Sequence, residues 1–225
     1  MAAFGPTEEQ LAAVQKDLGY TFRDKWLLRQ AFIHASAGEF NGLRLAWIGD
    51  AVMGMVVTQL VFASTLSGDC ETLHNRRKVM VTREFCAEAC RKMKWHNYAI
   101  VGKGYAKMDT DITMNMQGEL FEAVWGAQFV DSNGDYAAVM ASYERNFPLK
   151  DLAPVFAEIE AARKETEEAR AAAKKGKGKK HAAADEPSGE PGTPTIAEGY
   201  QDTIAKVLNG LLGDTADAPE FPESG

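Results

Sequence analysis

The hydrophobic positions of the chain recur with helical spacing from the N-terminus to about residue 148. Thr7-Glu8-Glu9-Gln10 has the spacing of a capping box and predicts a helix that continues to about Leu18. Apolar residues from Trp26 onward indicate a second helix that ends near His34. Further helices are expected over residues 43–62, 69–80, 82–93 and 136–147, and over the segment that ends near residue 131. No stretch alternates with period two for long enough to propose a sheet, so the sequence predicts an all-α fold.

The most apolar segment runs from Leu43 to Phe62 and carries a single carboxylate, Asp50, close to its middle. Its continuation to Leu66 approaches membrane-spanning length. Four polar or charged positions favour a core helix instead: Arg44, Asp50, Thr58 and Gln59. We therefore expect Asp50 to be buried. Because an unpaired buried carboxylate costs several kcal/mol, its presence here indicates a function.

Two more acids, Glu119 and Glu122, stand three residues apart in another apolar segment, a spacing that puts them on one helix face. Carboxylate oxygens are ligands that Mg²⁺ prefers, and bound Mg²⁺ can activate water for phosphodiester cleavage. Together with Asp50 these acids suit a magnesium site if the two helices cross near Gly49 and Ala123, where small residues allow close approach. Alternatively, both glutamates are solvent-facing helix acids.

The 225 residues allow one sizeable core with additional segments, and the net charge of −7 gives no whole-chain indication of nucleic-acid binding. Three cysteines cannot form a secreted disulfide framework, and the N-terminus lacks a signal-peptide profile. We expect an intracellular protein in a reducing compartment, cytoplasm or nucleus, with an organelle as the alternative. Cys86 and Cys90, near His74 and His96, allow a zinc site, but their spacing favours buried structural cysteines.

The composition changes beyond Pro148. We divide the chain into a helical domain over residues 1–150, a solvated helix over 151–175, a low-complexity basic and acidic linker over 176–194, and a short amphipathic helix with a disordered end over 195–225. The last three parts form a disordered, partly helical C-terminal tail.

The residues around the acids resemble a known family. Leu45-Ala46-Trp47-Ile48-Gly49-Asp50-Ala51-Val52 resembles the signature helix of ribonuclease III domains. Phe121-Glu122-Ala123-Val124-Trp125-Gly126-Ala127 resembles their second metal-binding helix, where an acid three residues earlier, here Glu119, is also expected. Leu18-Gly19-Tyr20-Thr21-Phe22 and the helix after it look like the opening of the same domain. The resemblance covers about residues 10–148, with the motifs in the right order.

This resemblance implies a ribonuclease III endonuclease domain-like helical fold that dimerises and cleaves double-stranded RNA with Mg²⁺, or alternatively Mn²⁺. By the resemblance to the family, Asp50 and Glu122 are expected to be the catalytic metal ligands, and Glu119 a third ligand. The signature helix of the family normally offers Glu at the positions of Leu43 and Ala46. Loss of the second Glu removes one of the usual metal ligands.

The same departures look much like the mini-ribonuclease III branch, which lacks this Glu, is catalytic and has no separate double-stranded-RNA-binding domain. Asn41-Gly42-Leu43 and Ile48-Gly49-Asp50-Ala51 carry the likeness. Nothing after Pro148 predicts the strands and helix of such a binding domain. Residues 1–36, by contrast, are more similar to the longer ribonuclease III opening.

RNA duplexes are recognised mainly through phosphates and 2′-hydroxyls, so the RNA surface needs cations. The candidates are Arg76, Arg77, Lys78, Arg83, Lys103 and Lys107, each of which could instead be an ordinary solvated charge. Two functions follow. The first is a magnesium-dependent, homodimeric endoribonuclease that cleaves double-stranded or structured RNA, as in rRNA processing. The alternative is a catalytically inactive member of the fold that serves as an RNA-binding or structural component, for example of an organellar ribosome or a splicing complex.

Overall fold

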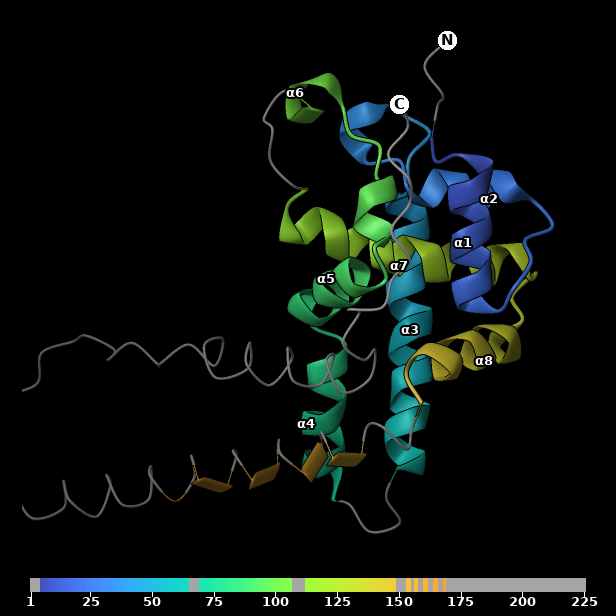
Figure 1. The fold of residues 1–225 in the computed structure, drawn as a ribbon. Coiled ribbons are helices and arrows are strands. Elements are labelled where there is room, and N and C mark those ends of the chain that lie inside the picture. Colours follow the sequence, from blue (N-terminus) through green and yellow to red (C-terminus); the bar gives the residue numbers. More distant parts are fainter. Residues whose placement is uncertain are drawn as a thin grey trace, which may run out of the picture.

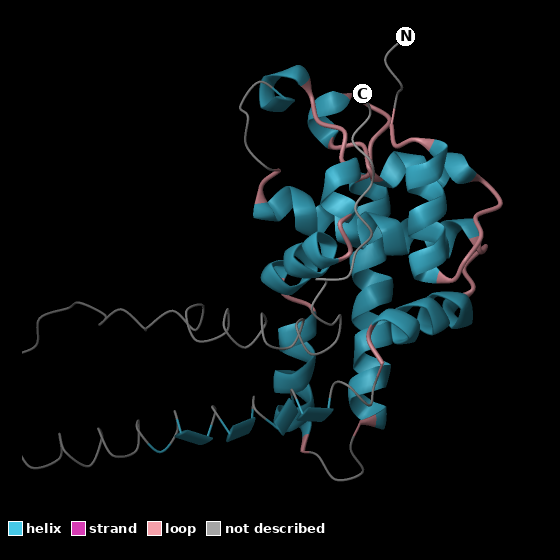
Figure 2. Cartoon of the chain, in the orientation of Figure 1, coloured by secondary structure: helices cyan, strands magenta, loops and turns pink. Residues whose placement is uncertain are grey.

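The computed structural model describes residues 5–64, 69–106 and 112–148, and scattered positions between 153 and 168. The predicted segments over 176–194 and 195–225 lie outside the described residues. The helices are α1 (Glu8–Leu18), α2 (Lys25–Ala31), α3 (Leu43–Ala63), α4 (Cys70–Met80), α5 (Arg83–Lys92), α6 (Lys103–Ala106), α7 (Met114–Asp131) and α8 (Tyr136–Asn146). Within the described ranges there is no strand, only one parallel bridge between Ile33 and Ile100 (Figure 2). The predicted all-α fold is confirmed.

Two differences from the sequence-based prediction lie in connecting segments. The second helix ends at Ala31 rather than near His34, because the chain there turns to pair with the segment around Ile100. His34 N donates to the carbonyl oxygen of Ile100 at 2.9 Å, and Ile100 N donates to that of Phe32 at 2.8 Å. The second difference is the short helix α6, since the hydrophobic pattern predicts no helix around residues 103–106; residues 107–111, which follow it, are outside the described part.

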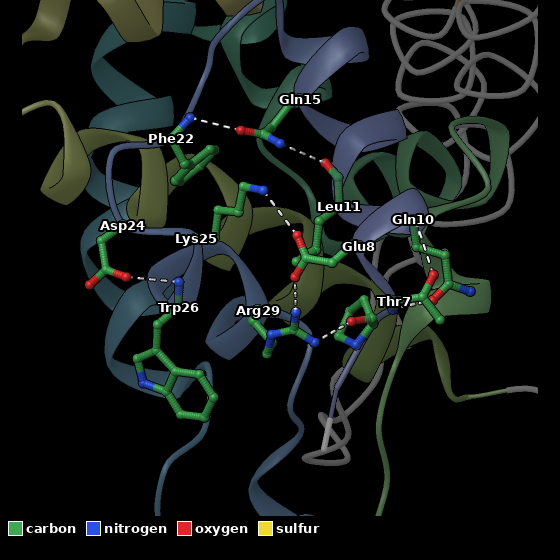
Figure 3. Close-up of polar contacts among 11 residues, drawn as sticks. Thr7, Glu8, Gln10, Leu11, Gln15, Phe22, Asp24, Lys25, Trp26 and Arg29 are labelled. Carbon is green, nitrogen blue, oxygen red and sulfur yellow. Dashed lines mark hydrogen bonds and ion pairs between the residues drawn. The ribbon is translucent and has the colours of Figure 1, made fainter. Parts of the chain in front are cut away.

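The predicted capping box starts α1. Thr7 Oγ1 accepts from Gln10 N at 3.2 Å, and Gln10 Oε1 accepts from Thr7 N at 2.8 Å (Figure 3). Glu8, in the first turn of α1, pairs with Lys25 Nζ at 2.9 Å and with Arg29 Nη2 at 2.6 Å, both on α2 (Figure 3). Glu8 is largely exposed in both ion pairs, so each pair contributes little free energy while linking α1 to α2.

The centre of the molecule is the crossing of α3 and α7, with the other helices placed around it (Figure 1). At Gly49 of α3, a Cβ atom would collide with the carbonyl oxygen of Glu122 on α7. At Gly126 of α7, a Cβ atom would collide with the carbonyl oxygen of Leu45 on α3. The two backbones are therefore in direct contact. The predicted crossing near Gly49 and Ala123 is confirmed, since Gly49 lies against the carbonyl group of Glu122, and Gly126 makes a second close contact one turn further along α7.

Buried aromatic rings surround this crossing and fill the space between α5, α7 and α8. Phe121 and Trp125 of α7 pack edge to face, with ring centroids 5.8 Å apart. The ring centroids of Trp125 and Tyr143 lie 5.1 Å apart, and those of Tyr143 and Phe147 lie 4.7 Å apart. Such pairs add directional stability to the area that they bury, so they fix α7 against its neighbours.

The cysteines of α5 belong to this core. Cys86 and Cys90 are fully buried, and burial raises the pKa of both thiols. Within the part of the chain that the structure describes, no three histidine, cysteine or acidic side chains gather closely enough to hold a metal ion. The prediction of buried structural cysteines is confirmed, and the zinc alternative has no support.

Helix α3 is covered on one side only. Among the described helices it alone is long and apolar enough to cross a membrane by length and composition, yet most of it is packed inside the fold, as expected of a core helix. Its uncovered side exposes Trp47 (81%), Met55 (60%) and Phe62 (71%), spaced so that they follow one face of the helix. Asp50 is also exposed. The expectation that Asp50 is buried is therefore wrong, because the apolar residues around it do not all face the core.

The backbone contact at Gly49 allows a prediction about the stability of the fold. In Gly49→Ala the new methyl group meets a backbone carbonyl that cannot rotate away, so the helices must separate. We expect the free energy of unfolding, measured by urea denaturation, to fall by about 3 kcal/mol. Gly54→Ala is a matched control on the same helix, because a Cβ there meets only the end of the Arg77 side chain. It should be neutral or stabilising by up to about 1 kcal/mol. Equal stability of the two variants would contradict the close crossing.

Candidate active site at the crossing of α3 and α7

The carboxylate of Glu122 is the most buried acid of the predicted site. Its side chain is only 8% exposed, and it lies on α7 where the Gly49 backbone touches that helix. Burial raises the pKa of Glu122, the nearby Arg83 guanidinium lowers it, and the negative charges of Asp50 and Glu119 raise it further. Asp50 and Glu119 therefore each lie within electrostatic reach of Glu122.

Asp50 lies close to Glu122 because the residue before it, Gly49, is the glycine at which α3 crosses α7. Gly49 holds α3 against the α7 backbone, and the next residue then stands at the edge of the contact. Asp50 opens onto a hollow between α3 and α4, lined also by Thr58 and Arg77. Arg77 Nε donates to Thr58 Oγ1 at 2.9 Å, which keeps its guanidinium against α3. A carboxylate and a fixed guanidinium thus share one open hollow.

Arg83 contacts Glu122 directly. Its Nη1 atom lies 3.0 Å from Glu122 Oε1, and its side chain is 37% exposed. Thr82 caps α5 by accepting from Phe85 N at 3.1 Å, which makes Arg83 the first residue of that helix. Its stem then passes over Gly118 of α7, where a Cβ would collide with the Cδ atom of Arg83. Sequence reasoning placed Arg83 among RNA contacts and missed this pairing; a glycine inside the apolar α7 segment was the available sign of a close approach.

Glu119 lies one helical turn before Glu122, partly buried, and lines a different hollow together with His34 and Leu43. Ala46, one turn before Asp50, is buried and offers no oxygen. Among the described residues no three possible ligands lie close enough to hold a metal ion as they stand, so the site is not preassembled. The donor chemistry fits a hard divalent cation, since all three candidates are carboxylates. Their assignment as ligands stays a prediction.

Arg76 is occupied by contacts within the chain. Its Nε donates to Glu160 Oε1 at 2.8 Å, its Nη1 donates to Ser64 Oγ at 3.0 Å, and its Cζ lies 5.1 Å from the ring centre of Phe156. Phe156 is fully buried, whereas the other described positions between 153 and 168 are exposed. The start of the C-terminal region is therefore anchored on α4, which argues against Arg76 as an RNA contact.

The other residues predicted to contact RNA lie at different places in the structure. Arg77 lines the hollow beside Asp50, and Lys78 follows it on α4 with an exposed side chain. Lys103 is exposed on α6. Lys107 lies outside the described residues. The structure brings Arg77 and Arg83 close to the acids, but it does not gather all the predicted cations at one place.

Comparison with known proteins agrees with this geometry. Residues 43–133 match the sequence pattern of the ribonuclease III domain. The ribonuclease 3 of Nitrobacter winogradskyi is 32% identical over 155 residues, covering 66% of this chain and 58% of that protein. The ribonuclease 3 of Methylococcus capsulatus is 33% identical over 139 residues, covering 61% and 60%. The chain thus spans somewhat more than half the length of these relatives.

Solved structures show the same fold. The nuclease domain of ribonuclease III from Campylobacter jejuni superposes with a TM-score of 0.55 and 25% identity, over 63% of this chain and 99% of that one. A second structure of that domain gives a TM-score of 0.53 and 26% identity, over 63% and 97%. The first was described for structural flexibility in a region involved in dimer formation. Residues 43–133 thus carry a ribonuclease III domain, and the helical core has the fold of the nuclease domain of ribonuclease III.

Proposed function

We propose that this chain is a magnesium-dependent endoribonuclease that cleaves double-stranded or structured RNA, as in rRNA processing. The observation that carries the proposal is the position of Asp50 and Glu122 on opposite sides of the α3–α7 backbone contact, within electrostatic reach of each other. These two residues are the proposed catalytic pair. A family match over residues 43–133, which include both acids and the crossing, supports the assignment.

Asp50, Glu119 and Glu122 would hold Mg²⁺, or Mn²⁺ in its place. When bound, the cation activates water and stabilises the charge that develops on the leaving oxygen. The burial of Glu122 lets its charge act through a medium of lower dielectric than water. The methyl side chain of Ala46 has no oxygen that could bind the cation. The proposed site therefore has one carboxylate ligand fewer than a site with an acid at this position.

The hollow beside Asp50 is the proposed path of the RNA backbone. Arg77, whose guanidinium donates to Thr58, can pair with an RNA phosphate in this hollow. The exposed Lys78 on α4 and Lys103 on α6 provide further positive charge for the RNA backbone. Contacts of this kind recognise an RNA helix by shape and phosphate position rather than by base sequence. They also make binding strongly dependent on salt concentration.

The uncovered face of α3 is the proposed homodimer contact. Large exposed apolar side chains follow this face at Trp47, Met55 and Phe62, and such patches mark interaction sites in soluble proteins. The Campylobacter jejuni nuclease domain is described with a region involved in dimer formation, which supports a dimer of this chain. We also propose an intracellular, reducing location, which the three unpaired cysteines support.

A catalytically inactive RNA-binding or structural component is the second candidate. The observation in its favour is Ala46, which leaves the first turn of α3 before Asp50 without a carboxylate. Against it stands the presence of three acids around one crossing, where Asn, Gln or an apolar residue would avoid their mutual repulsion.

Removing one carboxylate charge tests the enzyme proposal. We expect Asp50→Asn and Glu122→Gln each to lower the rate of cleavage of long double-stranded RNA in Mg²⁺ by at least about a hundredfold, because each loses a ligand. The exposed Glu144→Gln on α8 is the matched control and should cleave at the normal rate. Normal circular dichroism of all variants would show that folding is intact. Binding without cleavage by the unaltered protein, on several duplexes, would favour the structural component.

The dimer is tested by a charge on the exposed face of α3. Trp47→Glu should give a monomer in light scattering at micromolar concentration, because a carboxylate would be desolvated in the interface. Trp26→Glu on α2 is the control, since Trp26 is also an exposed tryptophan but belongs to a different helix. A monomeric unaltered protein, or equal masses for all three proteins, would contradict the proposed contact.

A further inference from the structure

Glu122 already has a cationic partner within the fold. Arg83 Nη1 lies 3.0 Å from Glu122 Oε1, and the carboxylate side chain is only 8% exposed. The Arg83 side chain is 37% exposed, so water partly screens this ion pair, but loss of Arg83 would leave the charge of the buried carboxylate unpaired. The chain therefore neutralises this carboxylate by itself.

The fold provides a specific path for Arg83. Gly118 stands one turn before Glu122 on the same face of α7. A side chain at Gly118 would collide with the stem of Arg83, so the missing Cβ leaves the groove through which the guanidinium reaches Glu122. At the other end the Thr82 cap fixes the start of α5. Both ends of the arginine are thus positioned by the backbone.

The contact depends on charge and shape rather than on an aligned hydrogen bond. Arg83 Nη1 is buried, yet it donates no hydrogen bond of good geometry to any described residue. A buried donor without a partner costs free energy, so this arrangement is not the most stable one that an arginine and a carboxylate can form. A metal ion at Glu122 would therefore displace a charge contact without breaking an aligned hydrogen bond of Arg83 Nη1.

We propose that Arg83 is a built-in counter-ion that competes with a divalent metal ion for the carboxylate of Glu122. The proposal rests on the proposed function, since it takes Glu122 as a metal ligand. Metal binding then requires the guanidinium to withdraw from Glu122 along the Gly118 groove. With a methyl group at Ala46, the site has few carboxylates to favour that exchange, so Arg83 sets how tightly the metal ion binds.

The test is a Mn²⁺ titration of the full chain, followed by the electron paramagnetic resonance signal of free Mn²⁺. Arg83→Met keeps the length of the stem and removes the charge. We expect it to bind Mn²⁺ about tenfold more tightly than the unaltered protein, the effect of one modest charge pair. Arg91→Gln is the matched control, because Arg91 is also on α5 and pairs with Glu88 at 3.4 Å, and it should change nothing.

A second variant covers the case in which Arg83→Met does not fold. Gly118→Ala keeps every charge but pushes the arginine stem out of its groove, so it should also tighten Mn²⁺ binding. Thermal melting gives an independent readout. Without Mn²⁺ the Arg83→Met protein should melt at a lower temperature than the unaltered protein, and it should gain more from added Mn²⁺.

Unchanged or weaker Mn²⁺ binding by both variants, with normal binding by the unaltered protein, would overturn the counter-ion role and leave the proposed metal site intact. If neither the unaltered protein nor the variants bind Mn²⁺ better than Glu122→Gln, the counter-ion role and the metal-dependent function both fail. The two failures are therefore distinguishable.

Discussion

The direct contact between the backbones of α3 and α7 is the constraint on which the rest of the structure depends. Two glycines, Gly49 and Gly126, face each other across it, and either one with a Cβ would force the helices apart. The interior of a protein is close-packed, so such a separation would be felt throughout the core around Trp125. The same contact brings Asp50 and Glu122, which belong to two distant segments, within electrostatic reach of each other. Stability and the candidate chemistry therefore share one cause.

The site combines two environments that the crossing separates. Glu122 faces inward and carries its own counter-ion, whereas Asp50 faces an open hollow with Arg77. The outer face of α3, which carries Asp50, also exposes the apolar side chains of Trp47 and Met55. A second copy that covers this face would change the surroundings of Asp50 directly. The proposed dimer contact and the proposed chemistry would thus be linked through one helix.

Much of the fold could be predicted from the sequence because its signals are local. The capping box at Thr7 and the cap at Thr82 mark helix starts through bonds that span three residues. The location of Glu119 and Glu122 on the same face of α7 follows from their spacing of three residues. The exposure of Asp50 could not be predicted, because a helix that is apolar all round has the same pattern whether one side faces the core or a partner. The partners of Arg76 and Arg83 were also missed, since they depend on contacts such as that with Glu160, which is 84 residues away.

The central claim is that the acids of α3 and α7 form one cation site at their crossing. Anomalous diffraction from crystals of the full chain grown with Mn²⁺ tests it most directly. The account predicts a manganese peak bound by the carboxylates of both Asp50 and Glu122, with the Arg83 guanidinium displaced from Glu122. Bare carboxylates with Arg83 still paired to Glu122, or manganese bound only elsewhere on the chain, would contradict it.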